Sequence, residues 1–492
     1  MPPSALILVL IDGLRADVLQ EAVAEGQTPH LQGLLGPDLQ HGYLGALTST
    51  APSVTFAAQA SLITGAPPNA HDIPGNQFFD RFGVHNRGKP RWFAFDVGET
   101  LQIDDALAVF TQGLANQCLG ARTLYERFAA WGWTSAVFGH MNANGADVWE
   151  PLPTTLLARL HFAQAPLGSQ PSEVDRHIIA RVKAYLKAHP LPHILTVYLI
   201  GLDHESHHHG PQAQKAYLSR VLDPLLGDLQ QTVAAASGPN AAAPFWVLAA
   251  DHGQTPVPAD DAHSLRLRWP TERELAGLFD ALGLDVLDHP GEGTHCDAVL
   301  ALNGGMAGIY LRRPRAEWSQ PPDFAQQVRP LARLVWRSHH RGSPTPALQG
   351  AVEAVLVRSV ERDGWQAGYA WLPPEPEADP LLLHEAPLPK HWVDPIARLN
   401  GLQGPLSPDI LILPKGQEGF YFGPPLSGVH GGLDPAASQA ALALGWPKPH
   451  TPWPAVREAF LHGLQRQMAM RGHRRPSIAD LLPALEYLWA HT

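Results

Sequence analysis

The stretch that decides the fold is residues 195–211, which read LTVYLIGLDHESHHHGP. Residues 195–200 form an apolar run of good strand formers, which predicts a strand buried inside a sheet. Asp203 and His207 follow four residues apart, so a helical turn after Asp203 would place both side chains on one face. Carboxylate oxygen and imidazole nitrogen are ligands that Zn²⁺ takes. The stretch alone fits a metal site and a solvated polar loop about equally well.

Two more apolar runs end in acidic residues. Residues 5–11, ALILVLI, lead into Asp12, and residues 244–250, PFWVLAA, lead into Asp251 and His252. Helical patterns lie between the runs, which predicts an α/β fold with a mostly parallel central sheet and helices on both faces. Ligands bind outside the carboxyl ends of such strands, so these side chains are candidate ligands. Alone, each residue would also fit a turn.

A hydroxyl and a loop histidine complete the candidate set. Thr55 and Phe56 precede a small-residue helix predicted at residues 57–63, and a turn-rich loop then leads to Asn76. The N-terminus of a helix attracts anions, but Thr55 or Ser53 also fits the common role of N-cap. His430 lies in the glycine-flanked loop GVHGG, residues 428–432, where an ordinary loop histidine is the alternative.

The sequence pattern changes after about residue 254. Residues 299–312 predict two strands around a Gly-Gly turn, and residues 353–372 predict a hairpin that turns at Asp363 and Gly364. We therefore predict a smaller α+β insertion, a lid or cap, at residues 255–405, and a catalytic core formed by residues 1–254 and 406–492. Residues 407–414 are predicted to return to the main sheet, and residues 477–489 to form a closing helix.

Composition excludes several classes of protein. The 492 residues are 45% hydrophobic and 16% charged, which indicates a globular chain, and a net charge of −11 argues against non-specific nucleic-acid binding. Two cysteines, Cys118 and Cys296, cannot build a disulfide framework or a cysteine-based zinc site. No apolar run approaches 18 residues and the first has no basic flank, so we predict a cytoplasmic protein without membrane contact.

Together the candidate ligands suffice for two metal ions. They are three carboxylates and three imidazoles: Asp12, Asp203, His207, Asp251, His252 and His430. Two divalent ions about 4 Å apart can clamp the attacking and leaving oxygens of a phosphoryl transfer. Thr55 offers a hydroxyl that a metal could activate as the nucleophile.

In this constellation the sequence resembles the alkaline phosphatase superfamily, and within it the nucleotide pyrophosphatase/phosphodiesterase branch. The matching motifs, in the order of that family, are LVLIDGLR at 8–15, PSVTF at 52–56, TGAPPNAHDIPGN at 64–76, DHESHHHGP at 203–211, DHG at 251–253 and GVHGG at 428–432. The resemblance covers the predicted core and says little about residues 255–405.

The resemblance implies two Zn²⁺ ions, with other divalent ions such as Mn²⁺ as alternatives. Asp12, Asp251 and His252 would hold one ion with Thr55 as its nucleophilic ligand, and Asp203, His207 and His430 would hold the other. Thr55 would form a phosphothreonine ester that a zinc-bound hydroxide then hydrolyses. Asn76 and the Phe56 backbone N–H would donate to phosphoryl oxygens, and the Phe56 ring would pack a nucleoside base or belong to the core.

Departures from the family pattern leave alternatives open. Asp72 stands where the family usually has glycine, so the loop to Asn76 is expected to differ. No arginine matches the phosphate clamp of the monoesterases, and its absence favours phosphodiesters or phosphonates. The expected partner is a small phosphorylated compound, with a nucleotide as one candidate and a nucleic-acid duplex excluded. A phosphonate hydrolase, a phosphomonoesterase and a non-catalytic metal-binding protein are the alternatives, and the oligomeric state stays open.

Overall fold

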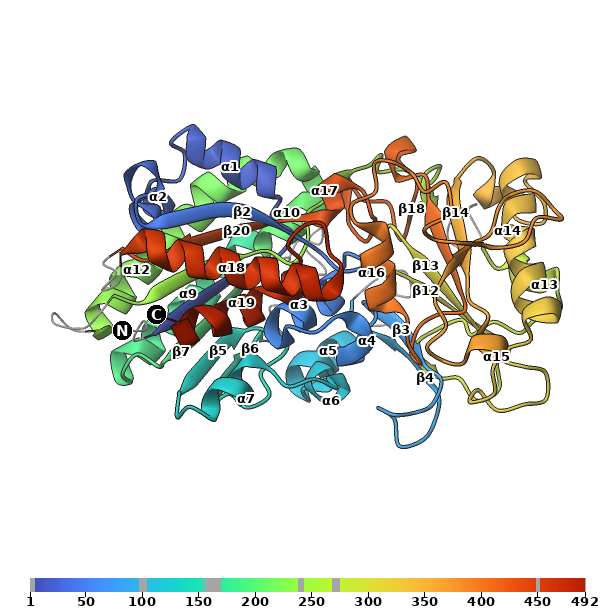
Figure 1. Ribbon diagram of the computed structural model, residues 1–492, viewed down its shortest axis with the longest axis horizontal. Helices are drawn as coiled ribbons and strands as arrows, with labels where there is room; N and C mark the ends of the chain where they lie inside the picture. Colours follow the sequence, from blue (N-terminus) through green and yellow to red (C-terminus); the bar gives the residue numbers. More distant parts are fainter. Residues whose placement is uncertain are drawn as a thin grey trace.

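The computed structural model describes residues 5–96, 104–153, 155, 170–237, 243–267, 275–447 and 452–491. Parts of the predicted core and residues 268–274 of the predicted insertion lie outside the described residues. In Figure 1 a large sheet with its helices occupies one end of an elongated molecule, and a second sheet with α13, α14 and α15 occupies the other. Each sheet has its own hydrophobic core.

The main sheet, as far as the described residues define it, contains seven strands. Their order is β2 (Gly42–Thr48), β20 (Gln439–Gly445), β8 (Phe245–Ala249), β1 (Leu6–Ile11), β7 (Ile194–Leu199), β5 (Ser135–Gly139) and β6 (Val148–Pro151). Strand β1 pairs in parallel with β7 and β8, and β5 pairs in parallel with β7 and β6. Strands β20 and β2 are antiparallel. The predicted mostly parallel α/β sheet is confirmed.

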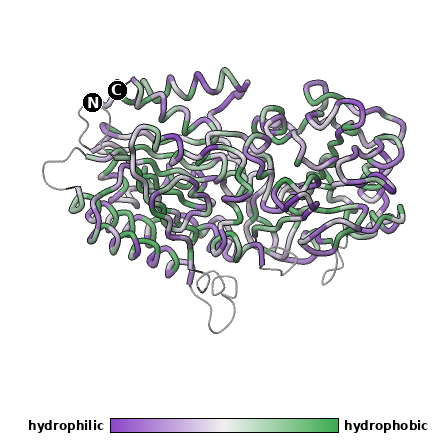
Figure 2. Tube along the Cα trace, turned by 90° about the horizontal axis from the view of Figure 1, so that it is seen from below, coloured by the Kyte–Doolittle hydropathy of each residue, from purple (hydrophilic) through white to green (hydrophobic). Residues whose placement is uncertain are grey.

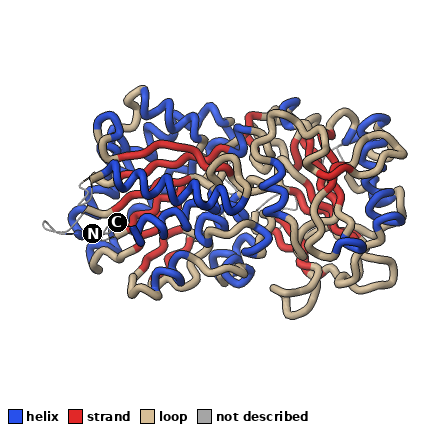
Figure 3. The backbone as a smooth tube through the Cα atoms, viewed as in Figure 1, coloured by secondary structure: helices blue, strands red, loops and turns tan. Residues whose placement is uncertain are grey.

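Helices flank the main sheet on both sides (Figure 3). One group contains α2 (Pro29–Leu35), α9 (Pro171–Ala188) and α12 (Asp223–Ser237); the other contains α3 (Thr55–Thr64), α18 (Trp453–Arg471) and α19 (Ile478–His491). Figure 2 shows hydrophobic and hydrophilic residues alternating along the helical turns of the chain, as expected for helices with one face on a core. In the described part of the chain, no helix has both the length and the hydrophobicity needed to cross a lipid bilayer.

The second sheet has the strand order β12 (Ala298–Leu302), β13 (Ala307–Leu311), β17 (Ile410–Pro414), β14 (Val352–Val357), β15 (Ala370–Trp371) and β16 (Leu381–Leu382). Its strands are antiparallel, and α14 (Arg329–Arg341) shares its core. Both predicted hairpins are confirmed, although the second connection contains the short helix α15 (Val360–Asp363).

The predicted return of residues 407–414 to the main sheet is wrong. Strand β17 pairs with β13 and β14 in the second sheet. A short apolar run that is buried on both faces has the same sequence pattern in any sheet. The pattern therefore predicts a strand but does not predict the strands with which it pairs.

Two small sheets join the ends of the molecule. Strands β3 (Gln77–Asp80) and β4 (Arg91–Ala94) pair with β11 (Gly291–Glu292), and β9 (Thr255–Pro256) pairs with β19 (Gly428–Val429). Asn76 lies directly before β3, and His430 lies directly after β19. The junction of the two ends therefore carries residues predicted for the site.

Candidate metal centre

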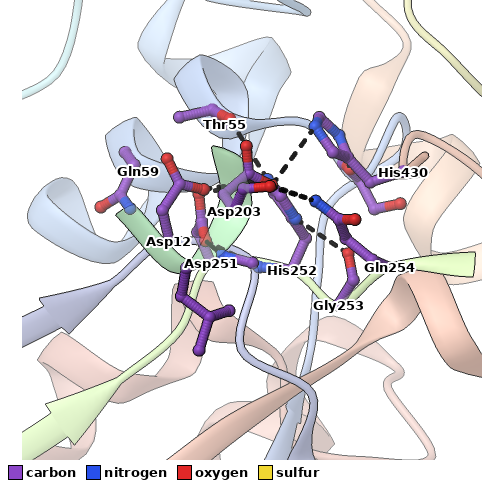
Figure 4. A network of polar contacts seen from close by, with 12 residues as sticks. Asp12, Thr55, Gln59, Asp203, Asp251, His252, Gly253, Gln254 and His430 are labelled. Carbon is purple, nitrogen blue, oxygen red and sulfur yellow. Dashed lines mark hydrogen bonds and ion pairs between the residues drawn. The ribbon is translucent and has the colours of Figure 1, made fainter. Parts of the chain in front are cut away.

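The carboxyl ends of three neighbouring strands bring the candidate ligands together (Figure 4). Asp12 follows β1, Asp251 follows β8, and Asp203 lies in α10 (Gly201–His209), which follows β7. The Nε2 atom of His252 lies 3.3 Å from Asp12 Oδ1 and 3.5 Å from Asp251 Oδ2. Pairing of β1 with both neighbours thus places Asp12 between the other two strand ends.

A second group of ligands adjoins the first. Asp203 and His207 lie one turn apart on α10, with His207 Nε2 at 3.1 Å from Asp203 Oδ2. His430 Nε2 lies 3.9 Å from Asp203 Oδ1, and the rings of His430 and His252 stack with their centroids 3.8 Å apart. The ligand atoms of Asp203, His207 and His430 are mutually close enough for one ion, and so are those of Asp12, Asp203 and His252.

The three imidazoles share one orientation. Their Nδ1 atoms lie 2.7, 2.9 and 3.2 Å from backbone carbonyl oxygens, in the pairs His207–Gly428, His252–Gly253 and His430–Ser53. A carbonyl oxygen can only accept, so each Nδ1 carries a proton and each Nε2 faces the cluster, where it presents a lone pair when the ring is neutral. Metal-binding histidines use this arrangement, in which a backbone acceptor fixes the ring and its tautomer.

The carboxylates are crowded and incompletely satisfied. Asp12 Oδ1 and Asp251 Oδ2 are buried and accept no hydrogen bond. Burial, with the charges of Asp251 and Asp203, raises the pKa of Asp12 well above its ordinary value. Burial also raises the pKa of Asp251, whereas His207 and His430 outweigh burial and lower the pKa of Asp203. Buried unpartnered carboxylate oxygens beside the Nε2 atoms of three imidazoles fit a divalent cation such as Zn²⁺.

Thr55 begins helix α3 and is not its N-cap. The N-cap position belongs to Val54, whose side chain makes no capping hydrogen bond. The Thr55 hydroxyl lies 3.2 Å from His252 Nε2. Because His252 Nε2 is an acceptor, the hydroxyl donates to it. Thr55 therefore faces the ligand cluster.

Asn76 is fixed from both sides. Its Oδ1 accepts the Phe56 backbone N–H at 2.9 Å, and its own backbone N–H donates to Asn303 Oδ1 at 2.8 Å. The Phe56 N–H is therefore occupied within the protein. Asn76 Nδ2 carries two hydrogens, so it can interact with Asp96 and still donate to a phosphoryl oxygen. The Phe56 ring is 6% exposed and lies 5.1 Å from the Phe95 ring, which favours its role in the core.

Asp72 has a backbone conformation that accounts for the glycine that the family usually has at this position. It is the C-cap of α4 (Pro68–His71) with φ of +67°, in the left-handed region that glycine favours. Aspartate tolerates this region better than most residues, so the loop toward Asn76 keeps a glycine-like turn.

Three residues at the site were not predicted in these roles. The Tyr198 hydroxyl donates to Asp12 Oδ2, and Gln254 Nε2 donates to Asp203 Oδ1. Ser53 Oγ donates to the Gly432 carbonyl at 2.8 Å and so links the Thr55 loop to the His430 loop. A tyrosine within the apolar run of β7 was a usable signal, because a buried hydroxyl needs a partner.

Known proteins resemble the chain in sequence and in fold. Residues 6–334 match the family model described as type I phosphodiesterase / nucleotide pyrophosphatase. An uncharacterized pyrophosphatase/phosphodiesterase of Schizosaccharomyces pombe is 35% identical over 77 residues, which are 16% of this chain and 14% of the yeast protein.

Two solved structures illustrate the likeness in fold. Murine ectonucleotide pyrophosphatase/phosphodiesterase 5 is similar with a TM-score of 0.56 and 14% identity, over 99% of this chain and 95% of that one. Phosphonoacetate hydrolase from Sinorhizobium meliloti, solved with phosphonoformate, has a TM-score of 0.54 and 17% identity, over 100% of this chain and 96% of that one.

Proposed function

Because the chain belongs to the type I phosphodiesterase / nucleotide pyrophosphatase family, we propose that it hydrolyses phosphodiesters of small molecules, including nucleotides, with Thr55 as the nucleophile. Two Zn²⁺ ions are the proposed cofactors. Asp12, Asp251 and His252 would hold one ion together with Thr55, and Asp203, His207 and His430 would hold the other. When bound, the ions supply positive charge that lowers the pKa of a nearby hydroxyl or water and stabilises phosphoryl oxygens.

The position of the Thr55 hydroxyl carries this proposal. It lies 3.2 Å from His252 Nε2, at the first residue of a helix whose N-terminal N–H groups favour an anion. The hydroxyl caps no helix, so local structure gives it no other role. An inactive variant of the murine relative, in which a threonine is replaced by alanine, has been solved with AMP, which supports a role for a threonine in this family.

In the proposed reaction the Thr55 oxygen attacks phosphorus as the alcohol leaves from the opposite side. The hydroxyl proton passes to solvent, and the leaving oxygen takes a proton from water. Asn76 Nδ2 donates to a non-bridging oxygen and so offsets charge that grows in the transition state. Water then attacks the phosphothreonine ester, which restores the hydroxyl and releases the phosphate product.

A phosphonate hydrolase is the second candidate. The fold shared with phosphonoacetate hydrolase supports it, since the same nucleophile and the same charge stabilisation could serve a carbon–phosphorus bond. A phosphomonoesterase is less favoured, because the sequence has no arginine matching the phosphate clamp. A cytoplasmic location remains a prediction of the sequence.

A substrate panel tests the proposal. Zinc-loaded protein should be assayed with bis(4-nitrophenyl) phosphate, 4-nitrophenyl phosphate, a dinucleotide and phosphonoacetate. We expect the aryl diester to have a larger kcat/KM than the monoester with the same leaving group. A clear monoester preference, or turnover of phosphonoacetate alone, would overturn the diesterase assignment, and no turnover with full metal occupancy would indicate a non-catalytic metal-binding protein.

A further inference from the structure

A carboxylate that has no role in the proposed reaction lies beside Asn76. Asp96 follows β4, and the backbone N–H of its neighbour Phe95 donates to the Asn76 carbonyl at 2.9 Å. Strand pairing sets Gln77 opposite Ala94. The side chains of Gln77 and Asn76 lower the pKa of Asp96, while the charge of Asp96 raises the pKa of His207. Asp96 is therefore close to the space in which Asn76 would hold a phosphoryl group.

The fold satisfies this carboxylate only in part. Asp96 Oδ1 is buried and has no hydrogen-bond partner, and burial raises the pKa of Asp96 to about 6 although Gln77 and Asn76 lower it. Asp105 makes a useful contrast in the same region. It accepts the Ala94 backbone N–H at 3.1 Å and pairs with Arg91, as a structural carboxylate does. A partly satisfied carboxylate next to a substrate-binding amide indicates a function in binding.

We propose that Asp96 is a specificity residue that excludes a second negative charge from the phosphoryl site and so selects monoanionic diesters over dianionic monoesters. This inference rests on the proposed function and names the feature that sets its substrate class. A diester carries one charge on its phosphoryl group, and a monoester carries two near neutral pH. With Asp96 beside the phosphoryl group, the neutral ester group of a diester would meet no repulsion, whereas the extra charged oxygen of a monoester would meet a like charge.

The physical effect is repulsion between like charges in a poorly hydrated site. Two unit charges a few ångströms apart interact far more strongly there than in bulk water. Specificity commonly uses such a repulsive element against the wrong ligand. The charge of Asp96 is thereby a second cause of the expected preference for diesters. The first cause is the lack of an arginine that would clamp the phosphate of a monoester.

Three variants test the inference. Asp96→Asn removes the charge and keeps the shape, Asp96→Glu keeps the charge, and Asp105→Asn removes a neighbouring charge that does not contact Asn76. The readout is the ratio of kcat/KM for 4-nitrophenyl phosphate to that for bis(4-nitrophenyl) phosphate. We expect Asp96→Asn to raise this ratio by about tenfold or more, mainly through a lower monoester KM. The other two variants should keep the ratio within about threefold of wild type.

Binding of inorganic phosphate to the zinc-loaded protein, measured by calorimetry, provides a readout that needs no turnover. Asp96→Asn should bind phosphate at least about fivefold more tightly than wild type, because one repulsion is removed. An unchanged ratio and unchanged phosphate affinity would overturn the inference, as would an equal loss of both activities, which would make Asp96 only a support for Asn76. If wild type cleaves neither ester, the proposed function fails, and the calorimetric comparison still decides whether Asp96 excludes charge.

Discussion

The guanidinium of Arg398 donates two hydrogen bonds to the carbonyl oxygen of Thr50, from Nε at 3.2 Å and from Nη2 at 2.5 Å. Arg398 lies on α16 (Pro395–Leu402), within the predicted insertion. Its other donors reach the Gly432 and Val393 carbonyls, each at 3.2 Å, and Ser438 Oγ at 2.7 Å. Thr50 precedes the Thr55 loop and Gly432 follows His430, so one side chain holds the loops that carry the nucleophile and a ligand.

Replacing Arg398 by methionine should destabilise the protein. The change leaves the buried carbonyl oxygens of Thr50 and Val393 without the donors of Arg398, and each such group costs about 1–3 kcal/mol. We expect the free energy of unfolding in urea to fall by about 3–5 kcal/mol. Arg362→Met, which removes an exposed ion pair with Asp363, should change it by less than about 0.5 kcal/mol. A loss below about 1 kcal/mol at Arg398 would show that the loops are held by other contacts.

Tyr198→Phe should weaken metal binding and preserve the fold. The Tyr198 hydroxyl donates to Asp12 Oδ2 and so directs the unpartnered Oδ1 toward the ligand cluster. Loss of such a supporting hydrogen bond lowers metal affinity by about 10–100-fold. Competition with a chromogenic chelator measures the affinity. Tyr125→Phe is the matched control, since its hydroxyl donates to Thr196 Oγ1 in the same core at 2.9 Å; equal effects of the two variants would contradict the assignment.

The sequence predicted those parts of the fold that depend on local pattern. The apolar run before Asp203 became β7, the polar segment after it became α10, and the six motifs correctly indicated the phosphodiesterase branch. The antiparallel strands β2 and β20 and the sheet membership of β17 were not predicted, because hydrophobic periodicity reports burial without reporting partners.

Residues that support the site from a distance were harder to predict. Arg398 is separated from Thr50 by 348 positions, and Tyr198 from Asp12 by 186. Neither has a motif, because a supporting residue needs only hydrogen-bond donors in the right place. The chemistry of metal ligands restricts residue type and position much more tightly, which is why the ligands could be proposed from the sequence.

The stability of metal-free protein should depend on pH through Asp12. Its pKa in the folded state is raised well above the ordinary value of 3.8, so its charged form is disfavoured by folding. Protonated Asp12 therefore contributes to the stability of the folded state below the ordinary pKa, and this contribution is lost as pH rises through the folded-state pKa. We therefore expect Asp12→Asn to be more stable than wild type at pH 8 without metal, by about 1 kcal/mol or more, with a smaller difference at pH 4.

Adding Zn²⁺ should reverse the order at pH 8, because wild type gains binding energy that Asp12→Asn largely loses. Denaturant melts with chelator and with zinc, at both pH values, measure the four stabilities. If zinc stabilised the two proteins equally, Asp12 would not be a ligand. If the stability difference between metal-free Asp12→Asn and metal-free wild type did not grow from pH 4 to pH 8, ionisation of Asp12 among the other buried carboxylates would not control the stability.

Substitutions of Thr55 distinguish a catalytic role from a structural role most directly. As the first residue of α3 it fills no cap, so Thr55→Ala should not incur the loss of about 1 kcal/mol that removal of a capping hydroxyl causes. Without the hydroxyl no phosphothreonine ester can form, and diester turnover should fall by about a thousandfold or more. Thr55→Ser keeps the hydroxyl and should retain part of the activity. Thr64→Ala, which removes a hydroxyl bonded to Ala60 at the end of the same helix, should keep wild-type turnover. Zinc content, melting temperature and turnover should be measured side by side for these variants. A Thr55→Ala protein with full zinc content and turnover within a few-fold of wild type would exclude the covalent mechanism. Water would then have to attack the diester directly.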